Sequence, residues 1–258
     1  MLVPLAGGGQ ETLLSEVGFV LLPLFTTAEA CALRLVCREF LAAVTEHPWE
    51  DRDTVIQGSI AAWRACLPHA RCANVQLHER CGGLNKRAAP VVDADFVHFE
   101  GLRELYMAGC RGVTNAAFVH LRGIHTLDMS GCYQRTVTDA AFAHLRGIQL
   151  LNMSFCNQFT DAAFVHLRGI HTLFMWYCNQ PAITDAAFVH LRGIHTLVME
   201  RCRQATITGA TFSCLKGVSL MGMSGCSNDA IAAARSMGFT VRTGLGAFGF
   251  LTYAFSNS

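Results

Sequence analysis

The stretch Thr138–Cys156, TDAAFAHLRGIQLLNMSFC, decides the fold because the chain repeats it six times between Val92 and Cys226. Part of it, AAFVHLRGIHTL, recurs without change from Ala116, Ala162 and Ala186. A cysteine closes each unit, and successive closing cysteines are 22 or 24 residues apart: Cys110, Cys132, Cys156, Cys178, Cys202 and Cys226. A fixed short period predicts a solenoid, in which each repeat buries its apolar face against its neighbours.

Within one unit the pattern changes from helix to strand. Thr138 is a residue type that caps helix N-termini, and Asp139 places a carboxylate in the positive first turn. Gly147 provides the left-handed residue that ends a helix. The following alternation of apolar residues, at Leu151 and Met153, is typical of a strand. Each repeat is therefore expected to contain a helix of about two turns followed by a short strand.

The unit resembles the cysteine-containing class of leucine-rich repeat, since it reads Ile/Val/Leu-x-x-Leu-x-Met-x-x-Cys followed by Thr-Asp. In that class the strands line a concave parallel sheet and the helices form the convex back. The resemblance implies an α/β fold, a leucine-rich-repeat solenoid, over roughly half of the chain.

A different pattern precedes the repeats. Apolar residues recur at helical spacing from Leu33 to Phe40, and Pro23 is expected to separate this helix from an earlier one. Thr27, which stands shortly before Glu29, is the expected helix cap.

This segment resembles an F-box, the three-helix motif that docks a protein onto the Skp adaptor of a cullin-RING ubiquitin ligase. The resemblance rests chiefly on Leu33–Arg38, LRLVCR, and on Pro48 and Trp49. It implies these adaptor-binding residues: Leu13, Glu16, Leu21, Phe25, Leu33, Val36, Cys37, Phe40 and Trp49. The alternative is an all-helical cap that covers the end of the solenoid, which every solenoid needs.

These patterns divide the 258 residues into five segments. We expect an unstructured lead (1–10), a small all-α F-box-like domain (11–50), a linker helix with a degenerate capping repeat (51–91), six repeats (92–228), and a C-terminal cap with an apolar tail (229–258). The linker helix is predicted from Ser59 to Leu67, and the last helix from Asp229 to Ser236. The tail, GLGAFGFLTYAF, can cover the open end of the stack.

Composition excludes several classes of function. A net charge of +1 without a basic cluster argues against a nucleic-acid surface, and no apolar run is long enough to cross a membrane. We recognise no secretory signal, so a cytoplasmic or nuclear location is expected. Six of the twelve cysteines occupy one repeat position, which favours buried thiols over bridges between turns.

No residues form a catalytic pattern, so the chain is not expected to be an enzyme or to need a cofactor. The group Cys66, His69, Cys72, His78 and Cys81 invites a zinc hypothesis. Its spacing matches no usual zinc motif, and a capping repeat is the plainer account.

The repeats differ most where strand alternation predicts the concave face. Large aromatic residues gather there in the third to fifth repeats, beside a charged pair, which is typical of a protein-binding hot spot. The predicted target-binding residues are Phe155, Phe174, Trp176, Tyr177, Val198, Glu200 and Arg201. The alternative is that Phe155 and Tyr177 pack against the neighbouring turn and that Trp176 is a tolerated surface residue.

The sequence thus predicts the substrate receptor of an SCF-type ubiquitin ligase, with a Skp-type adaptor and its cullin complex at one end and an unidentified target protein on the repeats. A stand-alone protein-binding scaffold with a helical cap is the alternative. The two hypotheses differ in whether Leu21, Phe25, Val36 and Phe40 face solvent or the first repeat.

Overall fold

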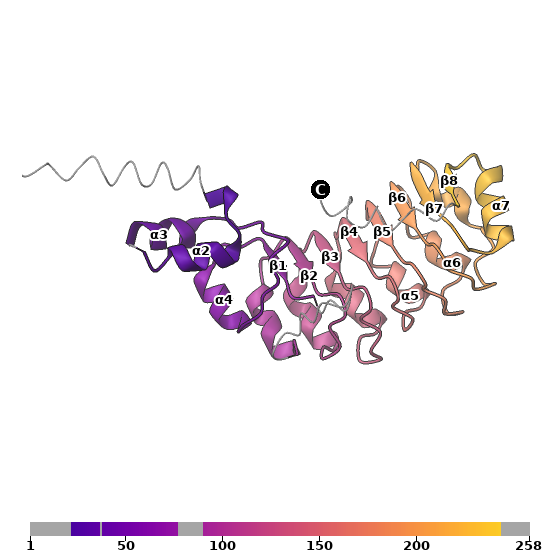
Figure 1. Ribbon diagram of the computed structural model, residues 1–258. Helices are drawn as coiled ribbons and strands as arrows, with labels where there is room; N and C mark the ends of the chain where they lie inside the picture. Colours follow the sequence, from indigo (N-terminus) through magenta and orange to yellow (C-terminus); the bar gives the residue numbers. More distant parts are fainter. Residues whose placement is uncertain (1–21, 37, 77–89, 244–258) are drawn as a thin grey trace, which may run out of the picture.

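A parallel sheet forms the concave side of the molecule. The computed structural model describes residues 22–36, 38–76 and 90–243. Its eight strands pair in chain order, and each lies in register with the next, so that equivalent residues of successive repeats lie side by side (Figure 1). The strands are β1 (Cys72–Asn74), β2 (Glu104–Tyr106), β3 (Thr126–Asp128), β4 (Leu150–Asn152), β5 (Thr172–Phe174), β6 (Thr196–Val198), β7 (Leu220–Gly222) and β8 (Val241–Arg242).

Short helices form the convex back of the repeats (Figure 1). They are η3 (Asp93–Phe99), η4 (Asn115–Leu121), η5 (Asp139–His144), α5 (Asp161–Phe164), α6 (Asp185–Phe188) and η6 (Phe212–Leu215). η3, η4 and η5 are 3-10 helices of about two turns, as predicted, whereas α5, α6 and η6 span only four residues each and are shorter than predicted. A 3-10 helix rises about 2 Å per residue, which lets a short repeat span the convex side with few residues.

One hydrophobic core runs through the whole solenoid. The phenylalanine that opens each repeat is completely buried, as the period predicts: Phe96, Phe118, Phe142, Phe164, Phe188 and Phe212. Rings of neighbouring repeats touch directly; Phe188 and Phe212 meet edge to face at 5.2 Å. Each repeat therefore completes the core of the next.

Five of the six closing cysteines are buried free thiols and Cys226 is partly buried, which confirms the sequence interpretation. Each Sγ donates a hydrogen bond to a backbone carbonyl of the preceding repeat, as from Cys156 to Met129 at 3.3 Å and from Cys202 to Met175 at 3.0 Å. Burial raises the pKa of Cys178 to about 12, so this thiol stays protonated near neutral pH.

An acidic ladder along the convex side is a feature that the sequence interpretation missed. Asp161 accepts hydrogen bonds from the backbone N–H and the hydroxyl of Thr184 in the next repeat, at 2.8 and 2.6 Å. Asp139 holds Thr160 in the same way. The aspartate thus joins two repeats, beyond its predicted place in the helix dipole.

The N-terminal region packs η1 (Leu22–Leu24), α2 (Thr27–Leu33) and α3 (Arg38–Glu46) around a small core of their own. The cap of α2 is Thr26 and not Thr27: Thr26 accepts from the backbone N–H of Glu29, whose carboxylate accepts from the N–H of Thr26 at 2.8 Å. Thr27 is the first helical residue. The chain then enters α4 (Ile60–Cys66), which is capped by Ser59 and lies within the predicted linker helix.

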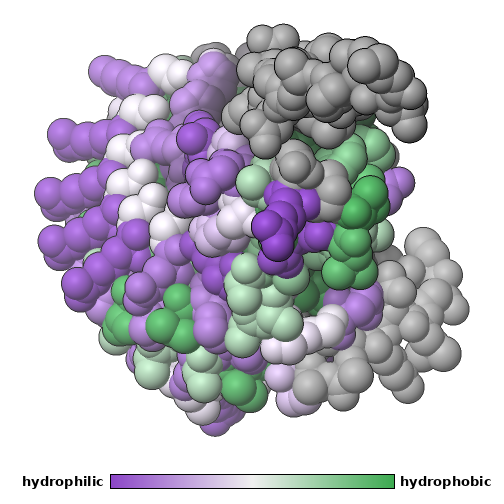
Figure 2. Space-filling model, turned by 90° about the vertical axis from the view of Figure 1, so that its left-hand side faces the viewer, coloured by the Kyte–Doolittle hydropathy of each residue, from purple (hydrophilic) through white to green (hydrophobic). Residues whose placement is uncertain are grey.

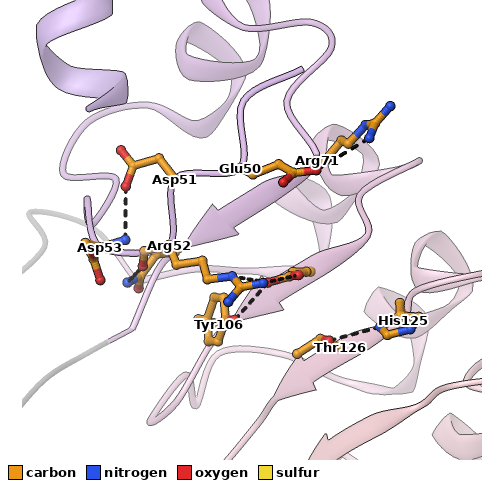
Figure 3. A network of polar contacts seen from close by, with 10 residues as sticks. Glu50, Asp51, Arg52, Asp53, Arg71, Tyr106, His125 and Thr126 are labelled. Carbon is orange, nitrogen blue, oxygen red and sulfur yellow. Dashed lines mark hydrogen bonds and ion pairs between the residues drawn. The ribbon is translucent and has the colours of Figure 1, made fainter. Parts of the chain in front are cut away.

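A polar network joins this region to the first strands of the sheet (Figure 3). Arg52 pairs with both carboxylate oxygens of Glu104 at 2.7 and 2.8 Å, and Tyr106 donates to the same carboxylate at 2.9 Å. Burial and the Glu104 carboxylate raise the pKa of Tyr106, so its hydroxyl remains a donor.

At the other end of the solenoid, α7 (Asn228–Ser236) confirms the predicted last helix, and β8 adds a final strand. The predicted lead (1–10), the stretch GGLNKRAA and the apolar tail lie outside the described residues.

Candidate protein-binding surfaces

The predicted target-binding residues lie on the concave side of β4 to β6 or just after these strands. The prediction that all of them are exposed is wrong, because Phe174, Trp176 and Val198 are at most 2% exposed. Leu173 and Met175 belong to the main core, whereas the alternating Phe174 and Trp176 form a separate cluster on the opposite face of the sheet. We call this cluster the aromatic patch; it comprises Leu150, Phe174, Trp176, Tyr177 and Val198. Parallel pairing places Phe174 beside Asn152 on one side and Val198 on the other.

Left-handed backbone marks the border of the aromatic patch. Phe155, Tyr177 and Arg201 have φ angles of 62°, 53° and 56°, a region that costs a side-chain-bearing residue about 1–2 kcal/mol. Glycine occupies the same position in the other repeats: Gly109, Gly131 and Gly225. The middle three repeats therefore keep large side chains where glycine would be unstrained, and strain of this kind is concentrated at functional sites.

These three side chains form a continuous stack, which we call the rim stack. The Phe155 and Tyr177 rings lie 4.9 Å apart at 16°, and the Arg201 guanidinium lies 5.3 Å from the Tyr177 ring. Phe155 is 38% exposed, while Tyr177 and Arg201 are half-buried. The rings do pack against the neighbouring turn, as the alternative interpretation expects, yet the stack still offers an aromatic edge and a cation to solvent.

Glu200 adds a carboxylate next to the rim stack. Its pKa is raised by burial, against the opposing effect of Arg201. Gly222 leaves room for it, because a Cβ at residue 222 would lie 3.0 Å from the Val198 side chain and 3.4 Å from Glu200 Oε1. The surface thus combines aromatic area, one cation and one anion, a composition suited to a peptide or protein surface.

A second surface lies on the N-terminal helices. Among the predicted adaptor-binding residues, Val36 is 67% exposed and Phe40 is half-buried. Phe25 and Leu33 pack against the small core, and Trp49 lies within it, with its indole N–H donating to Val44. Leu13, Glu16, Leu21 and Cys37 lie outside the described residues.

Three further exposed apolar residues extend this surface and were not predicted: Leu24, Leu35 and Leu41. Leu35 is 89% exposed, and its place beside Val36 in LRLVCR was the available signal. Figure 2 views this end of the molecule and shows hydrophobic side chains gathered on part of its surface. We call Leu24, Leu35, Val36 and Leu41 the apolar helical surface.

Other kinds of site find no support in the part of the chain that is described. Within 22–36, 38–76 and 90–243, no group of three or more His, Cys, Asp or Glu residues could hold a metal ion. His78 and Cys81 of the zinc hypothesis lie outside these ranges. The helices in the same ranges are too short or too polar to cross a membrane.

Comparisons with known proteins bear on the fold. No protein family matches the sequence, and no characterised protein is similar to it in sequence. TLR13, in the crystal structure of its complex with ssRNA13, is similar with a TM-score of 0.51 and 17% identity over 71% of this chain, which spans 25% of the TLR13 chain.

Two further structures have lower scores. A chain of the Rad7 and Elc1 complex in yeast has a TM-score of 0.46 and 15% identity, covering 60% of this chain and 44% of that one. Human 5T4 has a TM-score of 0.42 and 15% identity, covering 74% of this chain and 80% of that one. With eight parallel strands in one sheet and helices behind them, the fold is a leucine-rich-repeat solenoid.

Proposed function

We propose that this protein is the substrate receptor of an SCF-type ubiquitin ligase, acting in the cytoplasm or nucleus. The apolar helical surface docks a Skp-type adaptor, and through it the cullin complex. The aromatic patch and the rim stack bind a target protein. The exposure of Val36 is the observation that carries the proposal, because a helical cap would turn this residue toward the first repeat.

The packing of the other helical residues supports the same proposal. Phe25 and Leu33 pack within the small N-terminal core, which leaves Leu35 and Val36 at the surface. Exposed leucine and valine side chains beside each other are typical of a docking site, because contact with a partner removes their apolar area from water.

The mechanism that this arrangement supports is proximity. β1 and β5 are separated by four strand spacings, or about 19 Å, so an adaptor at the helical end and a target on the aromatic patch occupy different parts of the molecule. The chain itself supplies no chemistry: it raises the local concentration of target lysines near a partner that carries ubiquitin.

Adaptor binding is tested by co-purification with a Skp-type adaptor. We expect Leu35→Asp combined with Val36→Asp to abolish binding, because a charge would be buried at each apolar contact. Both side chains are exposed in the free protein, so the fold should survive. Val119→Asp on the convex helix η4, where Val119 is 41% exposed, is the matched control and should bind like the wild type.

Failure of the intact chain to bind any adaptor from its own source would contradict the ligase proposal. A stand-alone scaffold would then remain, since it needs only the aromatic patch and the rim stack. In that case Arg201→Ala would still weaken capture of the target, which separates the two functions experimentally.

A further inference from the structure

The stacking of the repeats gathers cations that the sequence keeps apart. Arginine or lysine follows the helical part of five consecutive repeats, at intervals of 22 or 24 residues: Arg122, Arg146, Arg168, Arg192 and Lys216. Equivalent residues of neighbouring repeats lie side by side, so these five side chains form one row, which we call the basic row. All five side chains are exposed. A chain whose net charge is only +1 therefore has a surface with a concentrated positive charge.

The neighbours of the basic row leave its charge uncompensated. In the part of the chain that the structure describes, none of the five cations forms an ion pair with a carboxylate. Glu100 occupies the equivalent position of the first repeat, where it pairs with His120 at 2.6 Å, and so it marks one end of the row. Aspartates of the convex side, such as Asp161, accept hydrogen bonds from the next repeat instead. The basic row is therefore a site for an anionic partner.

Histidines of the next repeat hold two of the arginines in place. The Nε–H of Arg122 donates to Nδ1 of His144 at 3.5 Å, and that of Arg146 donates to Nδ1 of His166 at 3.4 Å. Burial and the charge of Arg146 lower the pKa of His166, so this imidazole stays a neutral acceptor near neutral pH. A guanidinium that is held through Nε keeps its two terminal amino groups for a carboxylate outside the chain.

An apolar row runs beside the basic row. Three residues before the cation, four of the five repeats have an aliphatic side chain: Val119, Ala143, Val165 and Val189. At the end of the 3-10 helix η4, residues three apart lie one above the other, which places Val119 beside Arg122. Val119 is 41% exposed and Val165 is 42% exposed. An amphipathic acidic segment of a protein complements both rows, whereas a nucleic-acid backbone offers phosphates alone.

The spacing of the repeats matches the pitch of an α-helix. The repeat helices lie side by side along the convex side (Figure 1). Each cation follows the core phenylalanine of its repeat by four residues. The Phe164 and Phe188 rings lie 6.5 Å apart, and the Phe188 and Phe212 rings lie 5.2 Å apart. An α-helix advances about 5.4 Å per turn, so a helix along the basic row presents one carboxylate per turn to one cation per repeat.

We propose that the basic row and the apolar row together bind an acidic amphipathic helix of a partner protein. Its carboxylates contact the cations, and the apolar side chains of the adjoining stripe contact the valines. Four helical turns, about 22 Å or about 15 residues, span the row from Arg122 to Lys216. This inference goes beyond the ligase proposal, because the interaction uses neither the apolar helical surface nor the aromatic patch.

Fluorescence anisotropy of a labelled synthetic helical peptide tests the proposal with the full chain. The peptide has about 18 residues, with glutamate once per turn and leucine on the adjoining stripe. We expect the peptide to bind, and to bind more weakly as salt is added. The same peptide with glutamine in place of glutamate should bind about ten-fold more weakly or worse. Absence of binding at low ionic strength, or equal binding of the two peptides, would overturn the proposal.

Charge reversal within the row separates this surface from the general charge of the chain. Arg168→Glu with Arg192→Glu should weaken peptide binding about ten-fold or more, because carboxylates would then face carboxylates. Both side chains are exposed, so the fold should survive, which circular dichroism checks. Arg135→Glu with Arg203→Glu changes the net charge equally at exposed sites outside the row and is the matched control. It should bind like the wild type, and equal losses in the two double variants would contradict the proposal.

The apolar row distinguishes a protein helix from a nucleic acid. Val119→Ser with Val165→Ser should weaken peptide binding several-fold, because two apolar contacts are lost. A labelled single-stranded oligonucleotide that binds the wild type more tightly than the peptide, and equally well after the valine changes, would overturn the proposal. Co-purification with the Skp-type adaptor should be unchanged in Arg168→Glu with Arg192→Glu. Failure of this inference is therefore distinguishable from failure of the ligase proposal.

Discussion

Tyr177 shows at the scale of single residues how a binding role can be separated from a structural one. In the rim stack, the strain of the left-handed backbone, about 1–2 kcal/mol, opposes a stacking gain of about 0.5–1.5 kcal/mol. Replacing Tyr177 by glycine removes both. We expect Tyr177→Gly to change the free energy of unfolding by less than about 1 kcal/mol, while Leu173→Ala in the core costs about 2–5 kcal/mol.

Urea unfolding of both variants, together with capture of the target, tests this prediction. A loss well above 2 kcal/mol in Tyr177→Gly would show that the stack mainly stabilises the solenoid. A near-neutral stability with lost target capture is the result that the proposed function requires.

Glu200 gives the surface a predictable response to pH. Its pKa is raised by burial, so the folded protein favours the protonated carboxyl more than the unfolded chain does. The stability linked to this group is present below the ordinary glutamate pKa and is lost as the pH rises through the raised value. Glu200→Gln should therefore be more stable than the wild type at pH 7 and equally stable near pH 3, as judged by thermal unfolding at both pH values. A variant that is less stable at pH 7 would contradict this cause of the shift.

For single residues, the sequence correctly predicted which positions of each repeat lie on the concave side, but it did not predict how deeply these side chains are buried. The period alone put Phe155, Tyr177 and Arg201 at equivalent positions of neighbouring repeats, because equivalent residues stack in register. The left-handed backbone of Phe155, Tyr177 and Arg201 could have been predicted from the sequence, since glycine occupies the equivalent position in the other repeats, at Gly109, Gly131 and Gly225. The near-complete burial of Trp176 could not, because it depends on how Leu150, Phe174 and Val198 pack with it.

At the scale of an element, the aspartates of the acidic ladder, such as Asp139 and Asp161, join consecutive repeats. One repeat has asparagine in place of the aspartate, which shows whether the charge is needed. Asn115 stands where four of the other repeats have aspartate. Its amide accepts from the N–H of Thr138 and donates to the hydroxyl of Thr138. An amide can therefore replace the carboxylate. We expect Asp161→Ala to cost about 1–3 kcal/mol, because it leaves two donors of Thr184 without this acceptor, and Asp161→Asn to cost less than about 1 kcal/mol.

Chemical denaturation of the two variants measures the difference. Equal costs for alanine and asparagine would mean that charge, and not hydrogen bonding, holds the repeats together. The aspartate column was visible in the sequence, yet its partner was not. Sequence rules for helix capping consider residues of the same helix, whereas Thr184, the partner of Asp161, belongs to the next repeat.

The same limit explains why the sequence did not predict the type of each repeat helix. Caps, glycine stops and apolar spacing located every repeat helix, because these are local signals. Whether α5 forms an α-turn and η5 a 3-10 turn depends on how far each repeat must stretch to remain in contact with its neighbours. The type of a repeat helix is therefore set by contacts between stacked repeats and not by the helix propensity of its own residues.

At the scale of the whole molecule, two adjacent residues fix the helical region to the solenoid. Asp51 accepts from the N–H and hydroxyl of Thr27 in α2, at 2.7 and 2.9 Å. Arg52 pairs with Glu104 on β2. A receptor that acts by proximity needs this junction to be rigid, because the adaptor end and the target end must keep a constant distance.

The Asp51 carboxylate makes the junction sensitive to acid. Burial alone would raise its pKa, but hydrogen bonds from Thr27 and Thr54 outweigh burial and lower the pKa below the ordinary value of 3.8. The stability from this group is therefore present above pH 3.8 and is lost as the pH falls through the lowered pKa. Asp51→Asn should remove that pH dependence and weaken the junction at neutral pH.

Amide hydrogen exchange at pH 7 tests the prediction by region. Exchange in α2 should accelerate in Asp51→Asn, while exchange in β4 to β6 should match the wild type, because the solenoid core does not depend on Asp51. Acceleration in both regions would show that the helical region and the repeats unfold as one unit. Only local acceleration fits a chain in which the Asp51–Thr27 contact holds α2 at the end of an independently stable repeat array.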